Sequence, residues 1–293
     1  MKILVIGGTR FFGIHTVNEL LNNGHDVTIA TRGQAPDSFA HRVSRVSLER
    51  TDPKSMEKAL KDKYFDVVID KIAYCSNDIK YALDVLHCEQ YIHMSSTAVY
   101  SPKHLDTKEK EFTGLEQPTI WCSRNDFPYD EIKRQAEYAL WQTSPHFNTI
   151  AVRYPFVIGQ DDYTNRLLFY IENTLKERPM NIDNLHAQMS FIRSDEAGRL
   201  MAFLVGKSLT GPINGSSNGT ISIGEILDYI KLKTGKEAII TPSGIIAPYN
   251  GEVEYSINTD RAKSLGFEFT NLKDWIFDLI DYYIEQVTRS SSI

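Results

Sequence analysis

Three side chains in the first half of the chain have the types and spacing needed for proton transfer to a substrate oxygen. Tyr129 and Lys133 lie one turn apart on the same face of an expected helix. A phenol with an ordinary pKa of about 10 is a poor base at neutral pH, and a neighbouring ammonium group favours the phenolate. Ser96 ends an apolar strand upstream, and its hydroxyl could hold the substrate oxygen. The set indicates acid/base chemistry on an alcohol or a ketone.

A second pair has the same Tyr-x-x-x-Lys spacing, namely Tyr229 and Lys233. The spacing alone therefore identifies neither pair as functional. The first pair follows a serine at the end of a strand, whereas the second lies on a later helix. We therefore expect Tyr229 and Lys233 to serve the surface and packing only.

The first residues of the chain predict a site for a dinucleotide. A short apolar run at residues 3–6 suits a buried parallel strand, and an apolar pattern from Phe11 to Asn23 suits an amphipathic helix. A glycine-rich turn between a strand and a helix lets backbone N–H groups approach a pyrophosphate. The alternative is that the glycines only turn the chain. The candidate phosphate loop has the pattern GGxxxxG and consists of Gly7, Gly8, Thr9, Arg10, Phe11, Phe12 and Gly13.

The elements that position these residues alternate between strands and helices. Strands are predicted at residues 26–30, 43–47, 66–70, 90–94 and 149–153. In the second half, helices are predicted at residues 166–176, 195–205 and 222–234, and a strand near 189–192. This rhythm predicts an α/β fold, a Rossmann doubly wound parallel sheet with a smaller, mixed C-terminal substrate domain.

The best domain boundary is the turn-rich stretch from Pro155 to Asp162. We expect residues 1–158, completed by 188–216, to form the dinucleotide-binding domain. Residues 159–187 and 217–293 form the expected substrate domain. It ends in apolar residues at helical spacing between Trp275 and Val287, which predict a packing helix.

Composition excludes several classes of function. The 293 residues are 42% hydrophobic and 24% charged with a net charge of −6, which argues against broad binding to nucleic acid or anionic membranes. No apolar run is long enough to span a membrane, and the N-terminus shows no signal-peptide pattern. Cys75, Cys88 and Cys122 form no CxxC pair and no metal site is expected. We expect a cytoplasmic protein.

The chain resembles the extended short-chain dehydrogenase/reductase family of nucleotide-sugar epimerases and dehydratases. Within it, the chain is most similar to the atypical branch with a GGxxxxG loop, which also contains plastid RNA-associated proteins. The resemblance covers nearly the whole chain. It rests on the loop at 7–13, the segment Ser-Ser-Thr-Ala-Val-Tyr at 95–100, Pro128-Tyr129 to Lys133, Val152-Arg153 before Gly159, and residues 260–267.

The resemblance implies a role for each of the three candidates. Ser96 orients the substrate oxygen, Tyr129 is the acid/base, and Lys133 binds the nicotinamide ribose and lowers the pKa of the tyrosine. Many relatives also use an upstream asparagine in a proton relay. Asn77 is the nearby candidate here, with a helix cap as its alternative role.

Charge near the second strand indicates which cofactor is bound. Arg32 stands where NAD enzymes usually place an acidic residue, and it suits the 2′-phosphate of NADP. Arg10 could converge on the same phosphate. The alternatives are that both arginines are solvated surface charges and that the cofactor is NAD. Glu49 resembles the acidic residue that contacts adenine in the family.

The resemblance implies a small-molecule substrate, a nucleotide sugar, and an epimerase or a reductase; a homodimer is also compatible with it. Thr97 and Ala98 replace the Asp-Glu pair of sugar 4,6-dehydratases, which disfavours that activity. The alternative function is a non-catalytic NADP-binding regulatory or RNA-associated protein.

Three aromatic residues between Tyr100 and Pro128 could contribute to the substrate pocket or to the core. They are Phe112, Trp121 and Phe127.

Overall fold

The centre of the protein is a sheet of seven parallel strands in the order β10-β6-β5-β4-β1-β2-β3. The computed structural model describes residues 1–143 and 148–290. The order reverses between β1 and β4, the switch point at which doubly wound folds bind ligands. The strands are β1 (Lys2–Ile6), β2 (Asp26–Thr31), β3 (Ser44–Ser47), β4 (Tyr64–Asp70), β5 (His87–Ser96), β6 (Asn148–Tyr154) and β10 (Gly211–Asn214).

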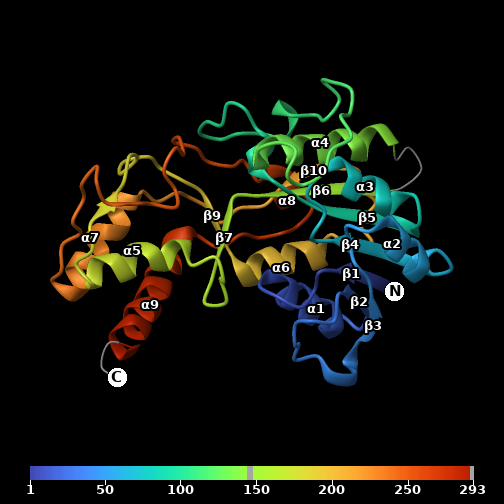
Figure 1. Ribbon diagram of the computed structural model, residues 1–293, viewed down its shortest axis with the longest axis horizontal. Coiled ribbons are helices and arrows are strands. Elements are labelled where there is room, and N and C mark those ends of the chain that lie inside the picture. Colours follow the sequence, from blue (N-terminus) through green and yellow to red (C-terminus); the bar gives the residue numbers. More distant parts are fainter. Residues whose placement is uncertain (144–147, 291–293) are drawn as a thin grey trace.

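Helices cover both faces of this sheet (Figure 1). On one face α1 (Phe12–Asn22) packs against α6 (Ser194–Phe203), and their apolar side chains share a core with β1 and β2. The other face carries α2 (Pro53–Leu60), α3 (Ser76–Leu83) and α4 (Tyr129–Thr143). Because both faces are covered, the central strands read as continuous apolar runs. The predicted Rossmann fold is confirmed.

The strands differ from the sequence prediction mainly at their ends. β5 extends to Ser96, two residues beyond the predicted end, so the candidate serine is the last residue of the strand. The stretch predicted as a turn after residue 155 contains a strand, β7 (Phe156–Ile158), which pairs with β9 (Phe191–Arg193). That part of the prediction is wrong because three residues are enough for a strand once a partner strand lies beside them.

The second lobe is built mainly from α5 (Arg166–Leu175), α7 (Ile223–Thr234) and α9 (Ile276–Ser290), which Figure 1 shows together at the end away from β3. The strands β8 (Met180–Asn181) and β11 (Ile245–Ile246) pair beside them. Ser222 caps α7 by accepting from the Glu225 amide, and Glu225 accepts in turn from the Ser222 amide. The expected C-terminal packing helix is α9.

The lobes exchange segments in both directions. β10 joins the sheet and α6 packs on α1, as a dinucleotide domain completed by residues 188–216 requires. However, Ala262 of α8 (Asp260–Ser264), Phe267 and Phe269 pack into the core around α1 and α6, although residues 217–293 were expected in the substrate domain. The domain limits stay a prediction, and their residues 144–147 and 291–293 lie outside the described residues.

Short 3₁₀ helices lie at Ala40–Arg42, Thr97–Val99, Glu109–Glu111 and Leu272–Asp274. No helix in residues 1–143 and 148–290 is long and apolar enough to cross a membrane. A cytoplasmic location and a homodimer stay predictions.

A buried ion pair stabilises the end of β5, the strand that carries the candidate serine. Arg153 of β6 and Glu137 of α4 are both 0% exposed, and Arg153 Nη2 lies 2.5 Å from Glu137 Oε2. The Ser95 hydroxyl donates to the same carboxylate. Arg153 also donates to the Glu109 carbonyl at 3.0 Å and the Phe112 carbonyl at 2.8 Å, which fixes the long segment after β5 to the sheet.

Candidate active site

Two adjoining cavities lie at the carboxyl ends of the strands. The first, of about 340 Å³, is lined by Gly7, Thr9, Arg10, Arg32 and Glu49 among others; we call it the cofactor cavity. The second, of about 380 Å³, is lined by Phe11, Phe12, Ser96, Tyr129 and residues of the second lobe; we call it the substrate cavity. Residues common to both walls are Lys71, Ile72, Tyr74 and Tyr163.

The phosphate loop passes close to its surroundings because its glycines lack side chains. Gly7 has a φ of +91°, and a Cβ there would lie 2.7 Å from Ile72. A Cβ on Gly13 would lie 2.8 Å from the Gly7 carbonyl oxygen, and one on Gly8 would lie 2.9 Å from Val17. Gly8 and Gly13 line neither cavity; their lack of a side chain lets neighbouring segments pack closely against the loop. The Gly13 and Ile14 amides of α1 donate to the carbonyls of Arg10 and Phe11 at 3.1 and 2.8 Å, so an anion at this end of the helix would be bound by the loop amides that precede them.

Three charged residues of the cofactor cavity, Arg10, Arg32 and Glu49, come from the phosphate loop and from the ends of β2 and β3, and others come from later segments. Arg32 Nη1 lies 3.8 Å from Glu49 Oε2, and the two side chains are 62% and 43% exposed. Glu49 also accepts from the Thr51 hydroxyl and amide, and these bonds hold the pKa of its carboxyl below the usual value. Arg10 is exposed and lines the same cavity. The arginines therefore do share one cavity.

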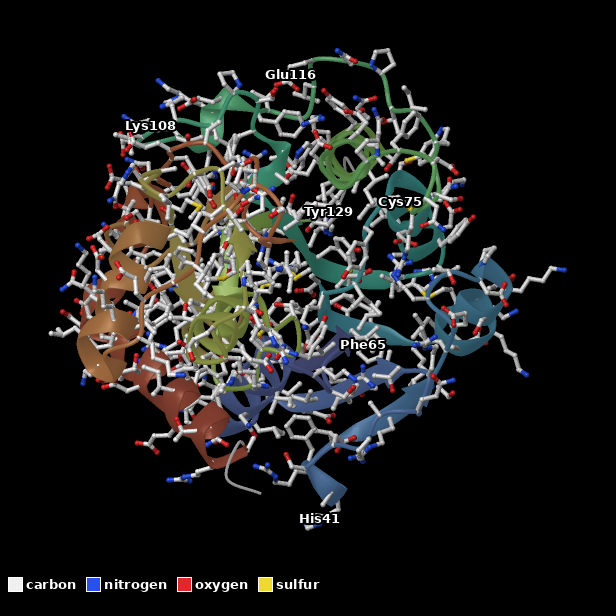
Figure 2. The ribbon with its side chains drawn as sticks, turned by 60° about the vertical axis from the view of Figure 1, so that its left-hand side comes forward. His41, Phe65, Cys75, Lys108, Glu116 and Tyr129 are labelled. Atoms are coloured by element: carbon white, nitrogen blue, oxygen red, sulfur yellow. The ribbon has the colours of Figure 1, made fainter. Side chains whose placement is uncertain are left out.

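Ser96 and Tyr129 meet at the wall of the substrate cavity. Ser96 Oγ accepts from the Ala98 amide at 3.1 Å, which fixes its position, and the nearby Ser96 hydroxyl tends to lower the pKa of Tyr129. Tyr129 begins α4, so its side chain projects from the end of that helix. Figure 2 shows Tyr129 near the centre of the view, whereas His41 and Lys108 lie at the periphery.

Lys133 lies beneath Tyr74. Its ammonium group donates to the Ala73 carbonyl at 3.0 Å and the Met94 carbonyl at 2.9 Å, and the residue is 0% exposed. The Tyr74 ring centroid lies 4.7 Å from Lys133 Nζ, and Arg124 lies 4.8 Å from the same ring. Lys133 is thus absent from the lining of both cavities.

The pKa of Tyr129 is raised to about 12, opposite to the expected lowering. The residue is 49% exposed, but desolvation of its hydroxyl group outweighs the opposing effect of the Ser96 hydroxyl. Lys133 Nζ lies 6.0 Å from the Tyr129 ring centroid and is not among the groups that lower this pKa. Burial lowers the pKa of Lys133 itself to about 8. Tyr129 is therefore a protonated phenol at neutral pH.

The structure adds residues to the site that the sequence reasoning missed. Lys71 and Tyr74 follow β4, and a polar residue directly after a buried strand is the signal that could have identified Lys71. Tyr163 contacts Phe11 edge-on at 5.8 Å between ring centroids. Arg166, at the start of α5, lines the substrate cavity.

Asn77 is not a helix cap, and its role in a proton relay stays a prediction. It lies inside the first turn of α3, after Cys75 at the cap position, and its side chain donates to the Ser123 hydroxyl at 3.5 Å. It lines neither cavity.

The other aromatic candidates and the second Tyr-x-x-x-Lys pair lie outside both cavities. Phe112 packs in the core against Tyr138, whereas Trp121 and Phe127 are 47% and 39% exposed and line neither cavity. Tyr229 and Lys233 both bind Asp281 of α9, at 3.0 and 2.8 Å.

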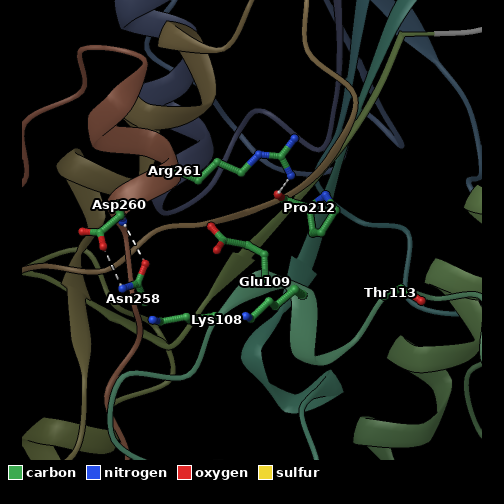
Figure 3. Close-up of a pocket in the computed structure, with 8 residues that line it drawn as sticks. Lys108, Glu109, Thr113, Pro212, Asn258, Asp260 and Arg261 are labelled. Atoms are coloured by element: carbon green, nitrogen blue, oxygen red, sulfur yellow. Dashed lines mark hydrogen bonds between the residues drawn. The ribbon is translucent and has the colours of Figure 1, made fainter.

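A further cavity lies near β10 and α8 (Figure 3). Arg261 there donates to the Pro212 carbonyl, and Asn258 exchanges hydrogen bonds with Asp260. Because these polar groups are used within the protein, this cavity offers no reactive arrangement comparable to that around Tyr129.

The family model described as "NAD dependent epimerase/dehydratase family" matches residues 3–224. Among curated proteins, the chloroplast stem-loop binding protein of 41 kDa b from Arabidopsis thaliana is 33% identical over 203 residues, covering 64% of this chain and 50% of that protein. The UDP-glucose 4-epimerase of Caenorhabditis elegans is 26% identical over 205 residues, covering 54% and 55%. The chain thus spans about half the length of these curated relatives.

Solved structures show the same fold at low sequence identity. The UDP-glucuronic acid 4-epimerase from Bacillus cereus, solved in complex with NAD, has a TM-score of 0.72 and 20% identity. The alignment covers 99% of this chain and 98% of that one.

Proposed function

Because the chain belongs to the NAD dependent epimerase/dehydratase family, we propose that it transfers a hydride between a nicotinamide cofactor and a secondary alcohol or ketone of a nucleotide sugar. The observation that carries this proposal is that Ser96 and Tyr129 line one cavity, which adjoins the cavity at the phosphate loop. The similarity to a UDP-glucose 4-epimerase supports a nucleotide sugar. Epimerase and reductase both fit this geometry, and the residues at Thr97 and Ala98 disfavour a 4,6-dehydratase.

The residues of the cofactor cavity fit a dinucleotide. Gly13 lets the loop backbone and Lys71 pack closely at the start of α1, and Gly7, Thr9 and Arg10 of the loop line the cavity that would receive the pyrophosphate. Arg10 and Arg32 provide positive charge in the same cavity. When bound, the nicotinamide ring supplies the acceptor and donor of the hydride.

The protein's own residues handle the proton. Ser96 orients the substrate oxygen, and Tyr129, protonated at neutral pH, donates to that oxygen as a ketone is reduced. In the reverse direction Tyr129 must first lose its own proton, and the phenolate then accepts the proton of the alcohol; positive charge near the hydroxyl would stabilise that phenolate. Lys133 is the cation beneath it, and its exposure to the cavity requires Tyr74 to move.

We infer a preference for NADP over NAD. Arg32 and Arg10 line the cavity at the end of β2, where the 2′-phosphate of a bound NADP belongs. Glu49 beside Arg32 supports the alternative, because a carboxylate can accept hydrogen bonds from the 2′-hydroxyl of NAD. Because Arg32 favours a 2′-phosphate and Glu49 favours a 2′-hydroxyl, substitution of Arg32 separates the two cofactors.

A second candidate function is RNA binding, which the similarity to the stem-loop binding protein favours. The net charge of −6 opposes it, since nonspecific RNA affinity depends on positive charge. A gel-shift titration with a structured RNA at physiological salt tests this candidate directly.

The enzyme proposal is tested with a panel of nucleotide sugars and both nicotinamide cofactors. Once turnover is found, Tyr129→Phe should keep cofactor affinity and lower the turnover rate by about 10²- to 10⁴-fold, the usual effect of removing a general acid or base. Tyr229→Phe is the matched control, because Tyr229 has the same spacing to a lysine but binds Asp281.

Full turnover by Tyr129→Phe would show that another group transfers the proton. Absence of binding to either cofactor by the unaltered chain would reject the enzyme proposal as a whole.

A further inference from the structure

Lys71 is a buried cation that the proposed reaction leaves unused. It follows Asp70 at the end of β4, is 8% exposed, and lines both cavities. Lysine is seldom buried to this extent without a partner of opposite charge. Its position at the junction of the cavities therefore needs an explanation.

The side chain of Lys71 is held against the phosphate loop. Its ammonium group donates to the Arg10 carbonyl at 3.2 Å and lies 3.8 Å from the centroid of the Phe12 ring. Gly13 makes room for it, because a Cβ there would lie 2.8 Å from Lys71 Cε. The lysine is therefore directed to the N-terminal end of α1, where the loop amides also lie.

No carboxylate within residues 1–143 and 148–290 forms an ion pair with Lys71 within 4.0 Å. Asp161 attracts it only from a longer range, and burial lowers the pKa of its ammonium to about 8. One carbonyl uses one of its three N–H donors. A buried ammonium with donors to spare and no counterion favours an anionic ligand.

We propose that Lys71 binds the pyrophosphate of the dinucleotide, together with backbone amides of the phosphate loop that precede α1. The inference rests on the proposed cofactor binding and adds a residue to it. A compact ammonium suits a phosphate oxygen as a point charge. The pyrophosphate is favoured over an anionic group of the substrate because the Lys71 ammonium group donates to a carbonyl of the phosphate loop and lies over the Phe12 ring of the same loop.

The test compares ligands that do and do not contain a pyrophosphate. Lys71→Met in the full chain should lower the affinities for ADP-ribose and for NADPH to a similar extent, by about 10- to 100-fold. This is the usual effect of losing a charge-assisted contact. Adenosine, which has no phosphate, should bind unchanged. Lys71→Arg keeps the charge and should retain most of the affinity. Calorimetry or competition against NADPH fluorescence measures each value.

Lys80→Met is the matched control, since Lys80 is an exposed lysine of α3 that pairs with Asp84. A thermal melt shows whether Lys71→Met is folded, and removal of an uncompensated buried charge should not lower its melting temperature. If that variant loses as much affinity for adenosine as for ADP-ribose, the substitution has disturbed the whole cavity, and the inference is wrong.

Two further results would overturn it. An unchanged affinity for ADP-ribose with a raised KM for the sugar would assign Lys71 to substrate binding. Unchanged affinity for every ligand would mean that Lys71 only supports the structure of the phosphate loop. If the unaltered chain binds neither ADP-ribose nor a dinucleotide, the proposed function fails and this inference fails with it. Normal binding by Lys71→Met overturns this inference alone.

Discussion

Arg153→Met should destabilise the protein strongly, because it leaves Glu137 as a buried carboxylate without its counterion. The wild-type guanidinium donates to Glu137 from Nε at 2.9 Å and from Nη2 at 2.5 Å. It also donates to the Tyr100 hydroxyl and to the carbonyls of Glu109 and Phe112. Both charged side chains are 0% exposed, so water cannot replace these bonds.

Breaking a fully buried ion pair by removing one partner costs about 3–5 kcal/mol. This is a large share of the roughly 5–15 kcal/mol that keeps a typical domain folded. With a denaturant slope of about 3 kcal/mol per molar urea, the unfolding midpoint should fall by about 1–2 M. Urea titration followed by circular dichroism measures this shift.

Two controls separate the buried charge from other effects of the substitution. Arg289→Met removes an arginine from an exposed pair with Glu285, and its cost should stay below about 1 kcal/mol. Adding Glu137→Leu to Arg153→Met removes the orphaned charge and should recover part of the lost stability, although Ser95 then loses its acceptor. A cost for Arg153→Met as small as that for Arg289→Met would refute the reasoning.

Two other predictions concern the cofactor and pH. Arg32→Ala should weaken NADPH by about 10- to 100-fold and NADH little, as the loss of one charge-assisted phosphate contact requires; titration of both cofactors checks it, and equal affinities unchanged by the substitution would reject an NADP preference. His15 Nε2 lies 3.1 Å from Asp161, and this bond raises the pKa of His15 above 6.5. The stabilisation is therefore fully present below about pH 6.5 and lost as pH rises through the raised pKa. His15→Gln should lower stability by up to about 1 kcal/mol at acidic pH, because the pair is partly exposed, and its difference in melting temperature from the wild type should shrink at alkaline pH. A difference that grows with pH would contradict this assignment.

The sheet could be predicted from the sequence because its signals are local. The apolar run at 3–6 followed by glycines specifies a strand and a turn, and the strand before Ser96 is bounded on both sides by polar residues. The proximity of Ser96 to the start of α4 follows from the carboxyl ends of parallel strands sharing one edge. The strands therefore follow from the periodicity of apolar residues, and the position of Ser96 near α4 follows from the topology of the sheet.

The surroundings of the two lysines could not be predicted in the same way. Lys71 reads as a solvated charge after a strand, and it becomes buried only because α1 starts directly over it. Lys133 was expected at the ribose, but the path of the loop after β4 places Tyr74 over it. Both outcomes depend on contacts between segments far apart in sequence, as does the packing of Phe267 and Phe269 on the side of α6.

The shared wall of the two cavities has a thermodynamic consequence. Lys71, Ile72 and Tyr74 belong to one short loop and line both cavities. A ligand that displaces this loop in one cavity changes the shape of the other, so the two occupancies are linked. Such linkage is reciprocal: the factor by which one ligand alters the affinity of the second equals the factor in the opposite direction. Tyr74 belongs to the same loop and covers Lys133. A ligand in either cavity that moves Tyr74 therefore also changes the exposure of Lys133 to the other cavity.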